Sequence, residues 1–195
     1  MSTGVEIVKD TVSGGLSKLK ADLESEKGIY ETCELAKALI SARTLAGDDV
    51  GGASFAPYSA SRYYAPIDDK YRPEGYPKPA GGRTTHKKHP EKQLKTMVFD
   101  AGYGQYKVGI GRPATVQLSV TGQMLADMAT NVSNPHEGEL FFTSKHSATK
   151  AHGHTTGANR LPKRDFFGIN ESNTTELAEN LAKILTKYIT KAGLS

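Results

Sequence analysis

Tryptophan is absent from this chain of 195 residues, and aromatic residues make up only 8% of it. The one cysteine, Cys33, cannot form an internal disulfide, which is typical of a reducing compartment, and we interpret it as a small core residue. Apolar runs of the ~18 residues that a membrane span requires are also absent. The first residues lack the basic and apolar regions of a signal peptide. We therefore expect synthesis in the cytosol and no membrane partner.

Strong charge of either sign is missing as well. The 25 Lys and Arg residues against 21 Asp and Glu residues give a net charge of +4, and the sequence pI is near 9.0. This balance permits contact with a polyanion but does not by itself indicate nucleic-acid binding. Because the hydrophobic fraction is only 37%, we expect a large share of the chain to face solvent or to be buried only by partner subunits. The length predicts a single domain over residues 1–195.

Helical periodicity is clear near the start of the chain. Residues 16–45 carry apolar side chains at spacings of three and four, which predicts one long helix. Gly28 leaves open either a bend or a break into two helices, because glycine weakens a helix interior by about 1 kcal/mol relative to alanine. Gly47 and the two aspartates that follow it are typical of a helix stop and a polar turn.

The last helix is predicted in more detail. Asn173 is a favourable N-cap, and Glu176 stands three residues later, where its side chain can reciprocate. Gly193 is placed to end the helix. Steps of three and four gather its apolar residues on one stripe, made of Leu177, Leu181, Ile184, Leu185 and Tyr188.

The middle of the chain changes to an alternating pattern, which is typical of strands. We expect strands at residues 96–100, 105–110, 115–120 and 140–143, with turns at 100–104 and 111–113. Short connections favour antiparallel neighbours, so these segments predict one small sheet of about four strands. Thr121 can cap a short helix carrying Met124, Leu125 and Met128. The fold class is therefore α+β.

A long proline-rich stretch precedes the strands. From Pro66 to Pro90 the chain has five prolines and almost no aliphatic residues, so we expect an extended loop or arm over residues 66–93. It is either a solvated linker or an arm that orders on a neighbouring subunit, with direct nucleic-acid contact a third interpretation. The side chains available to face DNA or a neighbour are Lys78, Arg83, Lys87 and Lys88.

Groupings that carry catalysis are hard to find. The glycine motifs match neither a dinucleotide fingerprint nor a phosphate loop, and no serine stands in a nucleophile elbow. His146, His152 and His154, with His136 before them, have a metal-like spacing but no cysteine or carboxylate close by. We interpret them as a polar connection whose histidines form hydrogen bonds. We therefore expect no enzyme, metal or cofactor.

Residues 161–170, LPKRDFFGIN, form the best-defined local signal. A basic turn, two adjacent rings and a glycine lead directly into the last helix, which is typical of a docking segment. We expect Phe166 and Phe167 to anchor that helix, and Arg164 to pair with a backbone carbonyl or a carboxylate nearby.

Three segments in this order resemble the phage virion morphogenesis or tail-completion family and the related minor tail components of long-tailed phages. The first is GGASFAPYSAS at residues 51–61, and the second is LSVTGQML at 118–125. The third joins Ala148 and His152 to LPKRDFFG at 161–168. The resemblance covers about residues 16–194.

This resemblance implies a structural virion protein of the neck or head-proximal tail, assembled in the host cytoplasm. Copies would form a ring, expected to be a hexamer, against connector or tail-tube proteins and around packaged DNA. Phe55 and Tyr58, within the first motif, are expected to pack or to form an interface. Tail terminator and head-closure roles are alternatives within this class, and a sequence-independent nucleic-acid-binding protein is the alternative outside it.

Overall fold

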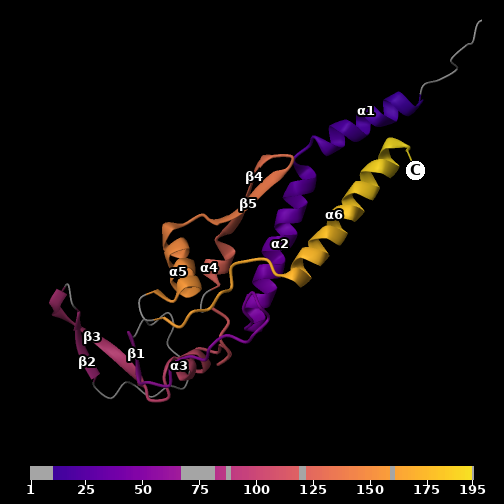
Figure 1. Cartoon of the computed structure of the whole chain (residues 1–195). Helices are drawn as coiled ribbons and strands as arrows, with labels where there is room; N and C mark the ends of the chain where they lie inside the picture. The colour runs from indigo at the N-terminus through magenta and orange to yellow at the C-terminus, as the bar shows by residue number, and fades with distance from the viewer. Residues whose placement is uncertain (1–10, 67–81, 87–88, 119–121, 159–160, 195) are drawn as a thin grey trace, which may run out of the picture.

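The computed structural model describes residues 11–66, 82–86, 89–118, 122–158 and 161–194. Helices and two antiparallel sheets occur along one chain, so the fold is α+β, as the sequence predicts. Figure 1 shows three helices, α1 (Thr11–Leu23), α2 (Lys27–Ala46) and α6 (Glu171–Ala192), as a helical end, with the three-stranded sheet at the opposite end. Between them lie α4 (Gln123–Ala126), α5 (Lys145–Thr156) and the β-hairpin formed by β4 (Met128–Asn134) and β5 (Glu137–Phe142). Among the described residues, no helix is long and apolar enough to cross a membrane.

The first helical region is two helices, α1 (Thr11–Leu23) and α2 (Lys27–Ala46). The break precedes Gly28, which is buried where α2 meets α6; a Cβ there would lie 3.5 Å from the Tyr188 hydroxyl oxygen. Of the two possibilities left open by the sequence, the break is therefore correct, and Gly28 serves packing. Gly47 ends α2 in the left-handed conformation with φ of 99°, as predicted.

The last helix, α6 (Glu171–Ala192), lies alongside α2 and reaches α1 (Figure 1). Its N-cap is Asn170, whose side-chain oxygen accepts from the backbone N–H of Asn173 at 2.8 Å. The predicted cap at Asn173 is therefore wrong by one turn, because Asn170 already has the extended backbone that a cap requires. Gly193 ends the helix as expected, with φ of 73°.

The three-stranded sheet is antiparallel, in the order β1-β3-β2. Its strands are β1 (Tyr63–Pro66), β2 (Gly82–His86) and β3 (His89–Phe99), with Tyr63 opposite Phe99 and Arg83 opposite Lys95. The predicted strand at 96–100 is thus the end of a longer one. The predicted loop over 66–93 is wrong in part, because backbone pairing organises residues 82–86 and those from 89 onward.

Two predicted strands are absent from the described residues. Residues 105–109 instead belong to α3 (Tyr103–Gly109), whose helical spacing brings Tyr103 and Tyr106 together against the ring of Tyr63, with Tyr106 also beside Phe99. The predicted turn at 100–104 therefore leads into a helix, with Gly102 as its N-cap at φ of 82°.

The segment predicted as a strand at 115–120 is irregular through Leu118, which has a positive φ of 48° that a strand does not allow. Thr121 lies outside the described residues, and Gly122 is the N-cap of α4 (Gln123–Ala126). Met128 does not belong to that helix, because it begins β4 (Met128–Asn134). This strand pairs with β5 (Glu137–Phe142), so the described residues form two separate sheets in place of the single one predicted.

The histidine-rich stretch, which we interpreted from the sequence as a polar connection, is a helix, α5 (Lys145–Thr156). Ser144 is its N-cap, and Asp127 accepts hydrogen bonds from the hydroxyls of Ser144 and Ser147. The buried residues of α5 are small, namely Ser147, Ala151 and Gly153, so the helix shows little apolar periodicity in the sequence.

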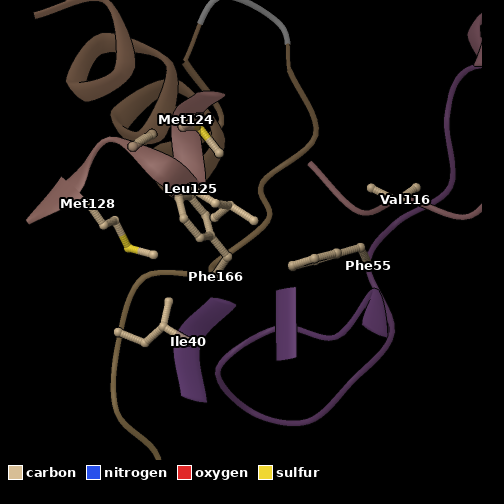
Figure 2. Close-up of a cluster of buried hydrophobic side chains, with 8 residues drawn as sticks. Ile40, Phe55, Val116, Met124, Leu125, Met128 and Phe166 are labelled. Carbon is tan, nitrogen blue, oxygen red and sulfur yellow. The ribbon is translucent and has the colours of Figure 1, made fainter. Parts of the chain in front are cut away.

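The main core gathers side chains from helices, strands and loops. Figure 2 shows the Phe166 ring beside Leu125, with Phe55 and Ile40 on nearby segments. The cluster consists of Ile40, Phe55, Val116, Met124, Leu125, Met128, Ala151 and Phe166. Its members come from widely separated parts of the chain, from Ile40 to Phe166, so the segment before α6 is held by the same core that holds α2, α4 and α5.

Candidate functional site

The segment between α5 and α6 is fixed by Arg164, which is 3% exposed. Its guanidinium donates through Nε and Nη2 to the carbonyl of Ala56, at 3.2 and 3.0 Å, and through Nη2 to that of Pro57, at 3.4 Å. Its backbone N–H donates to the carbonyl of His154 at 2.7 Å. The predicted pairing of Arg164 with a backbone carbonyl is confirmed. This residue therefore ties the third sequence motif to the first.

The two adjacent rings take different positions. Phe166 is completely buried in the main core (Figure 2). Phe167 is half-buried, and its ring centroid lies 5.2 Å from that of Phe142 in β5. Phe55 is also buried in the core. These contacts lie within one chain, and a role for these residues in an interface stays a prediction.

Arg43 of α2 connects the same segment to α6. Its Nη2 donates to the carbonyls of Phe166 and Gly168, at 3.0 and 2.7 Å, and its Nη1 donates to Oδ1 of Asn173. Burial lowers the pKa of Arg43, while Asp49 and Asp165 act to raise it. Phe166 is therefore anchored by its ring in the core and by its carbonyl on α2.

Tyr58 lies between two cationic side chains. Nζ of Lys107 and Cζ of Arg164 each lie 5.3 Å from the centroid of its ring, within the range of cation–π attraction. Lys107 is fully buried and donates to the hydroxyl of Tyr58 at 3.4 Å and to the carbonyl of Thr115 at 3.3 Å. Tyr58 therefore packs against its own chain, and its predicted interface role stays untested.

Burial shifts the pKa values of the side chains in this cluster. It lowers the pKa of Lys107, as does the positive charge of Arg112, and it lowers the pKa of Arg164 against the opposing effect of Tyr58. Burial also raises the pKa of Tyr58. The arrangement therefore places the Tyr58 phenol between two basic side chains in a part of the protein with little solvent.

A cavity of about 530 Å³ adjoins this cluster. Its basic lining residues are Lys150, His154 and Arg164, and none of the described residues that line it is Asp or Glu. Nδ1 of His154 is buried and has no hydrogen-bond partner among the described residues. Burial lowers the pKa of His154, and the charges of Arg164 and Lys150 lower it further. The remaining walls are aromatic, aliphatic or small polar: Tyr58, Ser59, Tyr63, Tyr103, Leu118, Gly122, Gln123, Met124, Leu161 and Pro162.

The three histidines singled out in the sequence do not converge. His146 and His152 are exposed on α5, whereas His154 lines the cavity. His136 lies at the turn between β4 and β5. In the described part of the chain, no group of three or more His, Cys, Asp or Glu side chains is placed to hold a metal ion.

The predicted basic residues of the arm are described only in part. Arg83 lies in β2, opposite Lys95 of β3. Lys78, Lys87 and Lys88 lie outside the described residues, so their facing DNA or a neighbour stays a prediction. The alternative of a nucleic-acid-binding protein depends on the same residues.

Sequence reasoning missed Arg43, Lys107 and Lys150. Arg43 could have been found from its position in the predicted helix. It stands three residues after Ile40, which places it beside the face of the helix that is buried, and it precedes Asp48 by five residues. Lys107 was missed because its segment was predicted to be a strand.

Comparisons of the chain with known protein families, with curated proteins and with solved structures found no match.

Proposed function

We propose that this chain is a structural protein of a long-tailed phage, located at the neck or the head-proximal end of the tail. Copies would form a ring that joins the head connector to the tail, and the chain would carry out no chemical reaction. The ordered sequence motifs at 51–61, 118–125 and 161–168 motivate this proposal. Arg164 supports it further, since it links the last of these motifs to the first through Ala56.

The observation that carries the proposal is an apolar stripe on α6 that the other described residues leave exposed. Ile184 and Tyr188 are buried, and Gly28 of α2 lies against both. Next to them, Leu181, Leu185 and Ile189 recur every four residues and are 40%, 37% and 39% exposed. Scattered exposed apolar residues are ordinary, but a run along one helix flank is typical of a surface that another subunit covers.

The neighbouring helix also carries exposed apolar side chains. α1 contacts α6 (Figure 1), and Leu16 and Leu23 of α1 are exposed. Burying a leucine or isoleucine side chain fully contributes roughly 1.5 to 3 kcal/mol. The helical end therefore offers a subunit contact of useful strength, while the three-stranded sheet lies at the other end of the molecule (Figure 1).

The charge of the chain suits a ring around DNA. A net charge of +4 favours a polyanion without a dedicated groove for it. Contacts with packaged DNA would then involve phosphates only, be independent of sequence and weaken as salt rises.

The direct experiment is to locate the chain in assembled particles. Mass spectrometry of purified virions should detect it, and imaging of labelled particles should position it as a ring between head and tail. A chain that is absent from virions, and that stays monomeric with its neighbouring proteins present, overturns the proposal. The position of the ring also separates head closure from tail completion and tail termination.

A variant pair tests the α6 stripe itself. Replacing both Leu185 and Ile189 with lysine should abolish assembly, because charges would enter the subunit contact, while the melting temperature changes little. Thr190→Lys is the matched control, since Thr190 is exposed on the same turn but away from the stripe. Normal assembly by the double variant contradicts a role for this stripe.

A further inference from the structure

The cavity between α5, the loop carrying Tyr58 and the segment that precedes α6 has an unusual combination of lining groups. Its volume of about 530 Å³ falls in the range of small-ligand sites and far exceeds the space of one water molecule. Met124, which lines it, also belongs to the main core (Figure 2), so the cavity reaches from the surface of the body towards the packed interior. It is therefore large and deep enough to enclose an organic molecule or a side chain.

We propose that this cavity is a binding site for a carboxylate carried on an apolar body, with Lys150 and His154 as the groups that contact the carboxylate. The claim depends on three basic side chains lining one cavity without an Asp or Glu among its described lining residues. It depends equally on the apolar and aromatic side chains that form most of the other walls of the cavity.

The polar end of the cavity lacks an internal counter-charge. Arg164 donates to the carbonyls of Ala56 and Pro57, which are neutral acceptors, and Lys150 is exposed at the rim. Arg164 is a buried cation, and a buried cation without an anion beside it costs free energy. A bound carboxylate would supply the missing negative charge at this end of the cavity.

The other walls determine what the carboxylate is attached to. Leu118, Met124, Leu161 and Pro162 are apolar, and Tyr58 and Tyr103 meet edge to face with centroids 4.9 Å apart. Such walls favour an aliphatic or aromatic body on the carboxylate, because apolar and aromatic side chains make up most of the lining. A small organic acid fits this description, and so does an acidic side chain on an apolar segment of a neighbouring subunit.

The test uses the full-length chain and 3-phenylpropionate as the probe, followed by isothermal titration calorimetry. 3-Phenylpropanol has the same apolar body without the charge, and it should bind at least about tenfold more weakly, because a charge-assisted hydrogen bond is lost. The imidazole NMR signal of His154 should move on addition of the acid. Equal binding of the acid and the alcohol, or no binding of the acid at millimolar concentration, overturns the proposal.

A matched pair of variants assigns the contact. Lys150→Met should weaken binding of 3-phenylpropionate by about tenfold. Lys145→Met is the control, because Lys145 is exposed on the same helix and does not line the cavity. Neither position is buried, so both variants should fold, and equal affinities for the two contradict the assigned contact.

The source of the natural carboxylate is distinguished by sedimentation. If an acidic side chain of a neighbouring copy occupies the cavity, 3-phenylpropionate should compete with it and shift oligomers towards monomers. If a free acid is the ligand, the probe should bind without changing sedimentation. The site itself does not depend on the proposed virion role, because its binding measurements require only the isolated chain.

Discussion

Gly138 of β5 faces the sulfur of Cys33 in α2 so closely that a Cβ at position 138 would lie 2.5 Å from Sγ. The same Cβ would lie 3.3 Å from Cγ1 of Ile29. Cys33 is buried, and burial and the charge of Glu34 both raise the pKa of its thiol. The β-hairpin therefore approaches α2 at a point where only glycine fits, and this contact links the hairpin to the helical end.

Replacing Gly138 with alanine should destabilise the protein by about 1 to 3 kcal/mol, as expected for overpacking. Urea denaturation measures the loss. Adding Cys33→Ala should recover much of it, because the smaller side chain removes the atom that the new methyl group meets. Gly104→Ala is the control, since no atom lies within 4 Å of its added Cβ. A double variant no more stable than Gly138→Ala alone would contradict the assigned contact.

Phe166→Ala should lower the free energy of unfolding by about 3 to 5 kcal/mol, because it opens a cavity in the main core. The sequence predicts that both Phe166 and Phe167 anchor the last helix. The structure ranks the two, since Phe167 is only half-buried and packs mainly beside Phe142. Chemical denaturation of both variants should find the smaller loss at Phe167, and equal losses would show that the ranking is wrong.

Asn170→Ala should cost about 1 kcal/mol, because the backbone N–H of Asn173 loses its acceptor at the start of α6. Glu176→Ala provides the comparison, since the capping box inferred from the sequence would make that residue equally important. We expect its effect on the melting temperature to be clearly smaller. If Glu176→Ala lowered the melting temperature more than Asn170→Ala, the N-cap would be Asn173, as the sequence predicts.

Stability should fall when the pH drops below 6.5, the ordinary pKa of histidine, because burial and the charges of Arg164 and Lys150 lower the pKa of His154 in the folded state. Within this window the unfolded chain binds a proton that the folded chain refuses, so stability is complete above 6.5 and decreases towards the lower folded pKa. Hydrogen bonds lower the pKa values of Asp127 and Glu34, so the stability that these carboxylates contribute is lost only when the pH falls below their ordinary pKa values of 3.8 and 4.5.

His154→Gln should therefore flatten the stability profile just below pH 6.5, measured by urea denaturation over a pH series. His152→Gln is the control on the exposed side of the same helix. Lys150→Met should raise the pKa of His154 in an NMR titration, since it removes one positive charge. An unchanged profile in His154→Gln would assign the pH dependence to other groups.

Local patterns were sufficient where a helix has a strong apolar stripe and a clear stop. The last helix and its end at Gly193 follow from side-chain spacing and from the left-handed conformation that glycine adopts easily. Gly47 ends α2 for the same reason. Arg164 was also predictable, because a basic residue between a proline and two rings needs an acceptor when it becomes buried.

Long-range packing decided the rest. Residues 105–110 alternate like a strand, but the rings that surround them favour the helical spacing of Tyr103, Tyr106 and Lys107. α5 buries small residues, which carry no periodic apolar signal.

The sequence by itself determined the α+β class, the last helix and its end at Gly193, since these depend on propensities and spacings within single stretches of chain. Only the tertiary structure decided that Lys150, His154 and Arg164 line one cavity, and that Tyr58 lies between Lys107 and Arg164. Such groupings join residues from distant parts of the chain, and one-dimensional patterns do not record which distant residues meet when the core closes.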